Sequence, residues 1–121
     1  MKRLILLAGA LAGLFGFSSG ANAHTLLDHA APAAGSTVQG SPPSIKLRFT
    51  RPLEPAFSTI KVLDRTGKPV DNADKVVDGA DRTILRVSLP RLSPGTYRVV
   101  WRVLSVDTHV TEGEFTFDVV Q

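Results

Sequence analysis

Hydrophobic and polar residues alternate in short runs along most of this chain, and a period of two is the pattern of a β-strand with one buried face. Turn residues, mainly glycine, proline and aspartate, separate the runs at intervals of about ten residues, as they do in all-β sandwiches. The alternation predicts strands over residues 44–49, 59–64, 83–89, 96–104 and 114–120.

The clearest strand is predicted over residues 96–104, where aromatic and β-branched residues alternate with arginines. The apolar face of this strand comprises Tyr97, Val99, Trp101 and Val103, and its polar face carries Arg98 and Arg102. Residues 105–113 are mostly polar and are predicted to connect this strand to the last one. Eight prolines and several glycine-containing turns argue against any long helix. We predict a single antiparallel β-sandwich of about seven strands.

The segment 92–97 has the spacing of a tyrosine corner, in which a tyrosine that opens a strand hydrogen-bonds back to the preceding crossover. The alternative is that Tyr97 is an ordinary core aromatic residue. Trp101 and Phe49 occupy alternating apolar positions, so we expect them in the core and not around a ligand.

The first 23 residues have the three parts of a secretory signal peptide. Lys2 and Arg3 come first, an apolar stretch interrupted by glycines follows, and Ala21-Asn22-Ala23 is a cleavage motif. A membrane anchor is the less favoured alternative, because it needs about 20 consecutive apolar residues. We therefore predict a signal peptide over 1–23 and one mature domain over 24–121, exported to the periplasm without membrane insertion.

Charge and cysteine content narrow the possible partners. The formal charge of +3 falls to about +1 when Lys2 and Arg3 leave with the signal, and the remaining charges alternate in sign. Nucleic acid is therefore not an expected partner. The chain has no cysteine, so neither a disulfide nor a thiolate ligand is available in an oxidising compartment.

Cleavage after Ala23 would make His24 the first residue of the mature chain, with a free α-amine beside its imidazole. In an extended segment Asp107 and His109 would project to the same side, two residues apart. The amine, two imidazoles and a carboxylate form a nitrogen-rich tetragonal set, which is typical of Cu(II) or Ni(II), and Cu(II) binds most strongly. The predicted metal ligands are His24, Asp107 and His109.

The mature sequence resembles the CopC family of periplasmic copper-binding proteins. The resemblance rests on His24 at the processed terminus, the turn over 31–36, the run over 45–50 and above all the block over 95–109, which ends in W-R-V-x-S-x-D-T-H. It implies an immunoglobulin-like or cupredoxin-like Greek-key sandwich. It also implies that His24, Asp107 and His109 hold one Cu(II) ion, for copper homeostasis or resistance.

Two features of this chain differ from other members of that family. Some members bind Cu(I) in a methionine-rich loop, but Met1 is the only methionine here, so we predict no methionine Cu(I) site. Relatives commonly carry an acidic residue where this chain has Arg51. A cation there would weaken Cu(II) binding unless it points away or pairs with Glu54 or Asp107.

The resemblance favours a non-catalytic, monomeric carrier that exchanges copper with an inner-membrane transporter or another periplasmic copper protein. One alternative is a copper-dependent oxidase or monooxygenase that uses the same histidine brace. Another is a structural or adhesive sandwich domain in which the D-T-H stretch is only a turn. His29 is an extra copper ligand or an exposed residue at a strand end, and the second interpretation is favoured. No hydrolase motif includes Ser105, Thr108 and His109.

Overall fold

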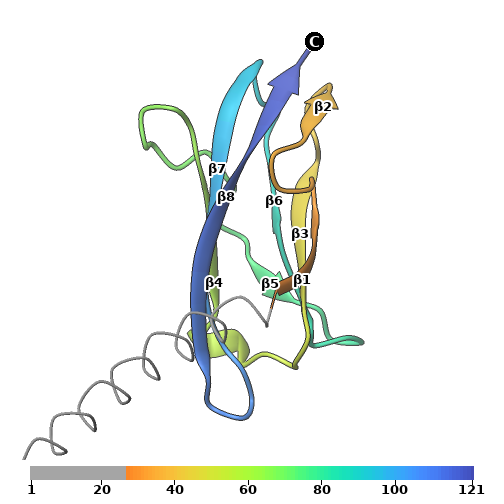
Figure 1. Ribbon diagram of the computed structural model, residues 1–121, viewed down its shortest axis with the longest axis vertical. Coiled ribbons are helices and arrows are strands. Elements are labelled where there is room, and N and C mark those ends of the chain that lie inside the picture. Colours follow the sequence, from red (N-terminus) through yellow and green to blue (C-terminus); the bar gives the residue numbers. More distant parts are fainter. Residues whose placement is uncertain (1–26) are drawn as a thin grey trace, which may run out of the picture.

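The computed structural model describes residues 27–121, which form two four-stranded β-sheets packed face to face (Figure 1). The first sheet contains, in spatial order, β1 (Leu27–Ala31), β3 (Ser44–Phe49), β6 (Ile84–Ser88) and β5 (Val76–Val77). The second contains β2 (Thr37–Gln39), β8 (Val110–Val120), β7 (Gly95–Leu104) and β4 (Thr59–Leu63). The predicted signal peptide and His24 lie outside the described residues.

Most connections cross from one sheet to the other, as is typical of Greek-key sandwiches. Only β5–β6 and β7–β8 join neighbouring strands of one sheet directly. The short 3₁₀-helix η2 (Pro55–Phe57) lies on the crossover from β3 to β4. The pairings are antiparallel except for β2, which runs parallel to β8. The predicted all-β sandwich is confirmed.

The predicted apolar faces form the core between the sheets. The inward residues of β3 and β7 are buried, whereas Lys46 and Arg48 on the other side of β3 are exposed. Trp101 packs edge-on against Phe49 at a ring-centroid distance of 6.4 Å, so both aromatics are core residues as predicted. The largest fully buried side chains are Phe49, Phe117, Ile45, Leu47, Leu53 and Leu85.

Tyr97 forms the predicted tyrosine corner. Its hydroxyl donates a hydrogen bond of 2.7 Å to the carbonyl oxygen of Ser93, on the crossover that leads from the first sheet into β7. The side chain is also buried against Phe117, with the two rings stacked at 5.8 Å. Tyr97 is therefore a core residue and a tether for the crossover at the same time.

The connection between β7 and β8 is shorter than the sequence indicated. We predicted a polar connection over 105–113, but β8 begins at Val110, which pairs with Leu104 at the end of β7. The first residues of β8 are mostly polar, so the sequence shows no clear alternation of hydrophobic and polar positions there. In the structure the alternation is present, because Thr111 is buried opposite Val103. Among the described residues, the resulting tight turn lies lowest in Figure 1, at the opposite end from the C-terminus.

No helix within residues 27–121 is long and apolar enough to cross a membrane.

Candidate metal centre

Ser105 organises the turn between β7 and β8. Its backbone N–H donates to the His109 carbonyl oxygen at 3.0 Å, and the Thr108 N–H donates to the Ser105 carbonyl oxygen at 2.9 Å. Its hydroxyl donates to Asp107 Oδ1 and accepts the His109 N–H at 3.3 Å. Ser105 is fully buried, so the residue that anchors this small hydrogen-bonded turn is fixed in the protein interior.

The crossover between β3 and η2 holds the turn from the side. Leu53 and Ser105 form an isolated antiparallel bridge, and the Val106 N–H donates to the Pro52 carbonyl oxygen at 3.0 Å. The end of β7 is tied to the same crossover, because the Glu54 N–H donates to the Leu104 carbonyl oxygen at 2.8 Å. The turn is therefore part of the sandwich framework.

Asp107 and His109 meet at this turn, although not in the conformation that we predicted. We placed them on an extended segment, but both lie in the turn, and Thr108 between them has a φ of 68°. A β-branched residue rarely adopts this left-handed conformation, which costs about 1–3 kcal/mol. His109 Nδ1 lies 3.5 Å from Asp107 Oδ1. The two predicted ligands converge because the backbone reverses between them.

Asp107 is held in its ionised form by three neighbours. The hydroxyl of Ser105 contributes most to lowering the pKa of Asp107, and the charges of Arg51 and His109 add to the effect. Its side chain is 36% exposed and that of His109 is 77% exposed. The pair therefore offers a carboxylate oxygen and an imidazole nitrogen at the molecular surface, where an ion can arrive and leave without opening the core.

Arg51 pairs with Asp107, one of the two acidic partners that we considered for this cation. Its Nη1 lies 3.4 Å from Asp107 Oδ2. Glu54, the other candidate partner, instead contacts Arg82 at 3.4 Å. The positive charge of Arg51 is thus directed at a predicted metal ligand.

The described residues supply two of the three predicted ligands. No group of three histidine, aspartate or glutamate side chains able to hold a metal is found within residues 27–121. His29 is exposed on β1, in register with Arg48, so the favoured interpretation was right about its exposure. It lies in the middle of the strand and not at a strand end as predicted. His24 stands three positions before Leu27, the first described residue.

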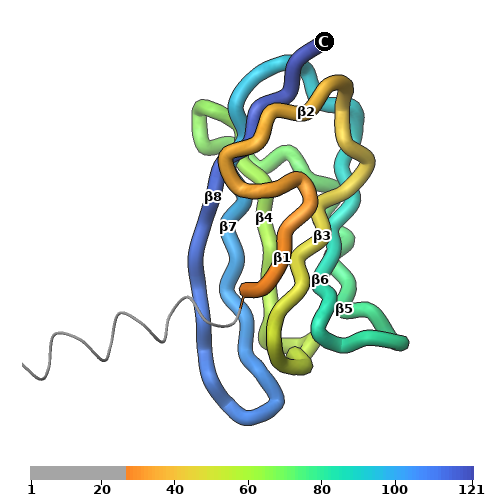
Figure 2. The backbone as a smooth tube through the Cα atoms, turned by 45° about the vertical axis from the view of Figure 1, so that its right-hand side comes forward, coloured from red at the N-terminus to blue at the C-terminus, as the bar shows by residue number. Residues whose placement is uncertain are grey.

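Leu27 lies toward the same end of the sandwich as the turn. It pairs with Phe49, the last residue of β3, and Arg51 two positions later contacts Asp107. Figure 2 shows β1 beginning in the lower part of the molecule, the part that ends in the β7–β8 turn. β1 therefore begins toward the end of the sandwich that carries Asp107 and His109.

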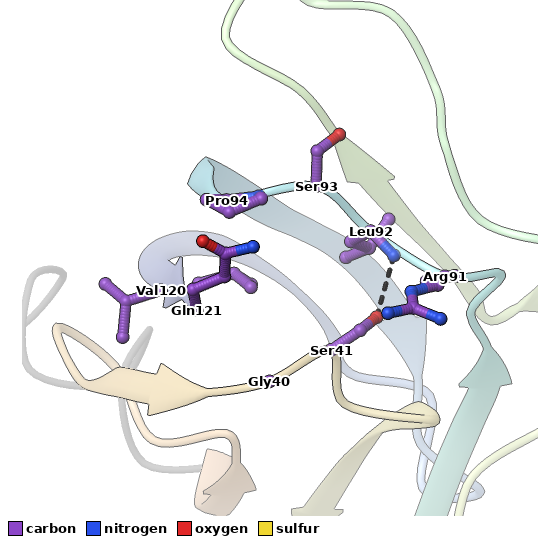
Figure 3. A pocket seen from close by; sticks show the side chains of 9 residues that line it. Gly40, Ser41, Arg91, Leu92, Ser93, Pro94, Val120 and Gln121 are labelled. Carbon is purple, nitrogen blue, oxygen red and sulfur yellow. Dashed lines mark hydrogen bonds between the residues drawn. The ribbon is translucent and has the colours of Figure 1, made fainter.

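A surface pocket lies at the other end of the sandwich (Figure 3). It is lined by residues of the β2–β3 and β6–β7 connections and of the C-terminus, and the Leu92 N–H donates to Ser41 Oγ within it at 2.7 Å. Its lining contains no histidine, aspartate or glutamate. The predicted metal ligands Asp107 and His109 are therefore on an open turn and not in this pocket.

Sequence reasoning missed the role of Ser105. We considered it only as a possible nucleophile, whereas the structure makes it the residue that orients Asp107. A serine two positions before an aspartate, in a segment rich in turn residues, is a local signal for such a hydrogen bond.

Residues 27–120 match the CopC domain family. The chain is 40% identical over 130 residues to copper resistance protein C of Escherichia coli, covering 98% of this chain and 97% of the relative. Its structure resembles the crystal structure of CopC from Methylosinus trichosporium OB3b, with a TM-score of 0.70, 39% identity and coverage of 79% and 93%.

A second solved structure is similar to the same extent. The crystal structure of PcoC, a methionine-rich copper resistance protein from Escherichia coli, has a TM-score of 0.69 and 38% identity, with 81% of this chain and 100% of PcoC covered. The matching family, the full-length relative and the shared sandwich agree with one another. The chain therefore belongs to the CopC family.

Proposed function

We propose that this protein is a periplasmic copper carrier that binds one Cu(II) ion through His24, Asp107 and His109. The observation that carries the proposal is the convergence of Asp107 and His109 on one exposed turn, with Nδ1 and Oδ1 3.5 Å apart. The copper resistance proteins to which the chain is similar support copper as the cargo. The third ligand is the amine and imidazole of His24, freed when residues 1–23 are removed as a signal peptide.

The donor set favours Cu(II) over Cu(I). Imidazole and amine nitrogens with a carboxylate oxygen suit Cu(II) in a tetragonal arrangement, whereas Cu(I) prefers thioether and thiolate sulfur. The sequence has no cysteine, and Met1 would be lost with the signal peptide. We accordingly propose no methionine Cu(I) site, in contrast to the relative that is described as methionine-rich.

The exposed position of the turn suits transfer of the ion to a partner. Five large apolar side chains are exposed among residues 27–121, and three of them lie at this end: Phe57 in η2, Val106 in the turn and Val110 at the start of β8. The Leu104 N–H donates to Ser58 Oγ, which places η2 beside the end of β7. We propose that an inner-membrane copper transporter or another periplasmic copper protein docks at this end and exchanges copper with the protein as a monomer.

We propose a carrier and not an enzyme. The relatives are named for copper resistance, and copper bound by an open turn can be passed on without a chemical step. Copper-dependent oxidation of a polysaccharide in the presence of a reductant would contradict this proposal.

The ligand set is tested by exporting the full chain from a Gram-negative host and purifying the processed form. Its intact mass should begin at His24, and it should bind one equivalent of Cu(II) with a tetragonal spectrum. His24→Ala, Asp107→Asn, His109→Ala, or one extra glycine before His24 should each weaken binding at least about tenfold, or 1.4 kcal/mol, because each removes or blocks a ligand.

His29→Ala is the matched control, because this exposed histidine lies on β1 outside the proposed ligand set. It should bind Cu(II) as tightly as the parent protein. Unchanged affinity in the His24 and His109 variants, or a loss of affinity in His29→Ala, would contradict the proposed ligands.

A further inference from the structure

Arg51 brings a positive charge to the oxygen of Asp107 that the turn itself leaves free. Asp107 Oδ1 accepts the Ser105 hydroxyl and faces His109, whereas Oδ2 lies 3.4 Å from Arg51 Nη1. One oxygen of the Asp107 carboxylate thus contacts residues of the turn, and the other contacts the guanidinium of Arg51. A metal ion bound by Asp107 would have to share this carboxylate with Arg51.

The position of Arg51 is set by the fold and not by chance contact of a long side chain. It stands two residues after the end of β3, and the next two residues, Pro52 and Leu53, are bonded to the turn at Val106 and Ser105. The side chain is 59% exposed, so water screens its charge but does not remove it. Arg51 is therefore held next to any cation that Asp107 binds.

Pairing with Asp107 was expected to spare Cu(II) binding, but Asp107 is itself a proposed ligand. We infer instead that Arg51 is a competing cation that lowers the affinity of the site for Cu(II) and favours release of the ion. This inference rests on the proposed function and concerns the same site. Arg51 contributes a positive charge that repels a divalent ion and also attracts the carboxylate oxygen that the ion would use. At the dielectric constant of water, repulsion between a unit charge and a divalent ion about 6 Å apart corresponds to about a tenfold loss of affinity.

A purely structural role for Arg51 predicts the opposite sign. If the Arg51–Asp107 ion pair served only to hold the turn, its loss would loosen Asp107 and weaken copper binding. If Arg51 competes with the ion, its loss should strengthen binding. The direction of the change therefore separates the two roles.

The experiment compares Cu(II) affinities of the processed full-length protein and its variants, by titration against a competing chelator at low ionic strength. Arg51→Ala should bind Cu(II) about tenfold more tightly than the parent. Arg51→Lys keeps the charge and should stay close to the parent. Arg98→Ala removes one positive charge from β7, where Arg98 pairs with Glu114, and should leave the affinity within about twofold.

Ionic strength provides a second readout, because a gain in affinity that arises from charge repulsion should shrink as salt screens the charge of Arg51. At about 0.5 M sodium nitrate, screening should reduce the difference between Arg51→Ala and the parent to about threefold or less. Equal or weaker binding by Arg51→Ala, with the parent binding copper, would overturn the inference and leave the proposed function intact. Failure of both proteins to bind Cu(II) would overturn the proposed function and the inference with it.

Discussion

Trp101 and Gly113 face each other in the register of β7 and β8, and the indole ring occupies the space above the glycine. A Cβ atom at Gly113 would lie 2.6 Å from Trp101 Cζ2, closer than any carbon contact allows. Trp101 cannot retreat easily, because it also packs against Phe49 and Phe115. Its Nε1 has no hydrogen-bond partner in the described part of the chain, so the indole contributes by packing.

Gly113→Ala is expected to destabilise the protein by about 1–3 kcal/mol, because the added methyl group displaces the indole from a filled core. Gly79→Ala is the matched control, since nothing lies within 4 Å of a Cβ at that position. Urea unfolding followed by tryptophan fluorescence measures both variants. Equal stability of the two would show that the indole moves aside without cost.

Ser105 and Thr108 show that the hydrophobic and polar pattern does not predict the conformation of a turn. The alternation rule correctly predicted that Trp101 and Tyr97 are buried, because burial follows from the face of a strand. The extended conformation that we assumed for Asp107 and His109 was wrong, because Ser105 closes a turn there and Thr108 has a positive φ. A residue's hydrogen-bond partners at a turn depend on neighbours that periodicity does not describe.

At the scale of elements, the strands with clear alternation were predictable and the others were not. β3 coincides with its predicted range of 44–49, and β7 begins one residue earlier than predicted. β2 and β5 were missed because they are short, and β1, although as long as β4 and β6, was missed because it lacks clear alternation. Each of these three strands pairs with a strand that was predicted: β1 with β3, β2 with β8 and β5 with β6. The position of each therefore depends on its partner strand.

The crossover from β6 to β7 depends on the tyrosine corner. Tyr97→Phe keeps the aromatic packing on Phe117 but removes the 2.7 Å hydrogen bond to the Ser93 carbonyl. The variant should lose about 1 kcal/mol of the free energy of unfolding, measured by chemical denaturation. Tyr97→Leu should lose more, because the ring stacking goes as well. Parent-like stability of Tyr97→Phe would mean that water replaces the hydroxyl without cost.

At the scale of the whole molecule, several aspartates tie loops to strands and make stability sensitive to acid. The pKa of Asp74 is lowered chiefly by the Ser88 hydroxyl, that of Asp64 by Thr66, and that of Asp81 by Thr83. A carboxylate whose pKa is lower in the folded state stabilises the protein above its unfolded-state pKa. That contribution is lost as the pH falls through the folded-state value.

The free energy of unfolding should therefore decrease as the pH falls below about 4, and replacing Asp74 should make the decrease less steep. Asp74→Asn removes the titrating group, and Ser88→Ala removes the hydroxyl that lowers its pKa. Both variants should be less stable than the parent at neutral pH and should differ from it less at pH 3. Denaturation at several pH values measures this, and an unchanged acid dependence in both variants would contradict the assignment.

The candidate copper site is also a property of the whole molecule. Arg51 and Asp107 are 56 positions apart in the sequence, and their ion pair forms because Leu53 bridges Ser105. The sequence indicated both residues and offered Asp107 as one possible partner of the cation. The choice of Asp107 over Glu54 came only from the packing of the β3–β4 crossover against the turn.

The amino-acid sequence by itself determined which residues form the core and which ligand chemistry is available. Alternation reports which face of a strand is buried, and composition leaves nitrogen and oxygen ligands without cysteine. Only the tertiary structure decided that Asp107 and His109 converge through a reversed backbone, that the Ser105 hydroxyl donates to Asp107, and that Arg51 pairs with Asp107. These features depend on hydrogen bonds and ion pairs between distant segments, whereas local periodicity reflects only the burial of each segment by itself.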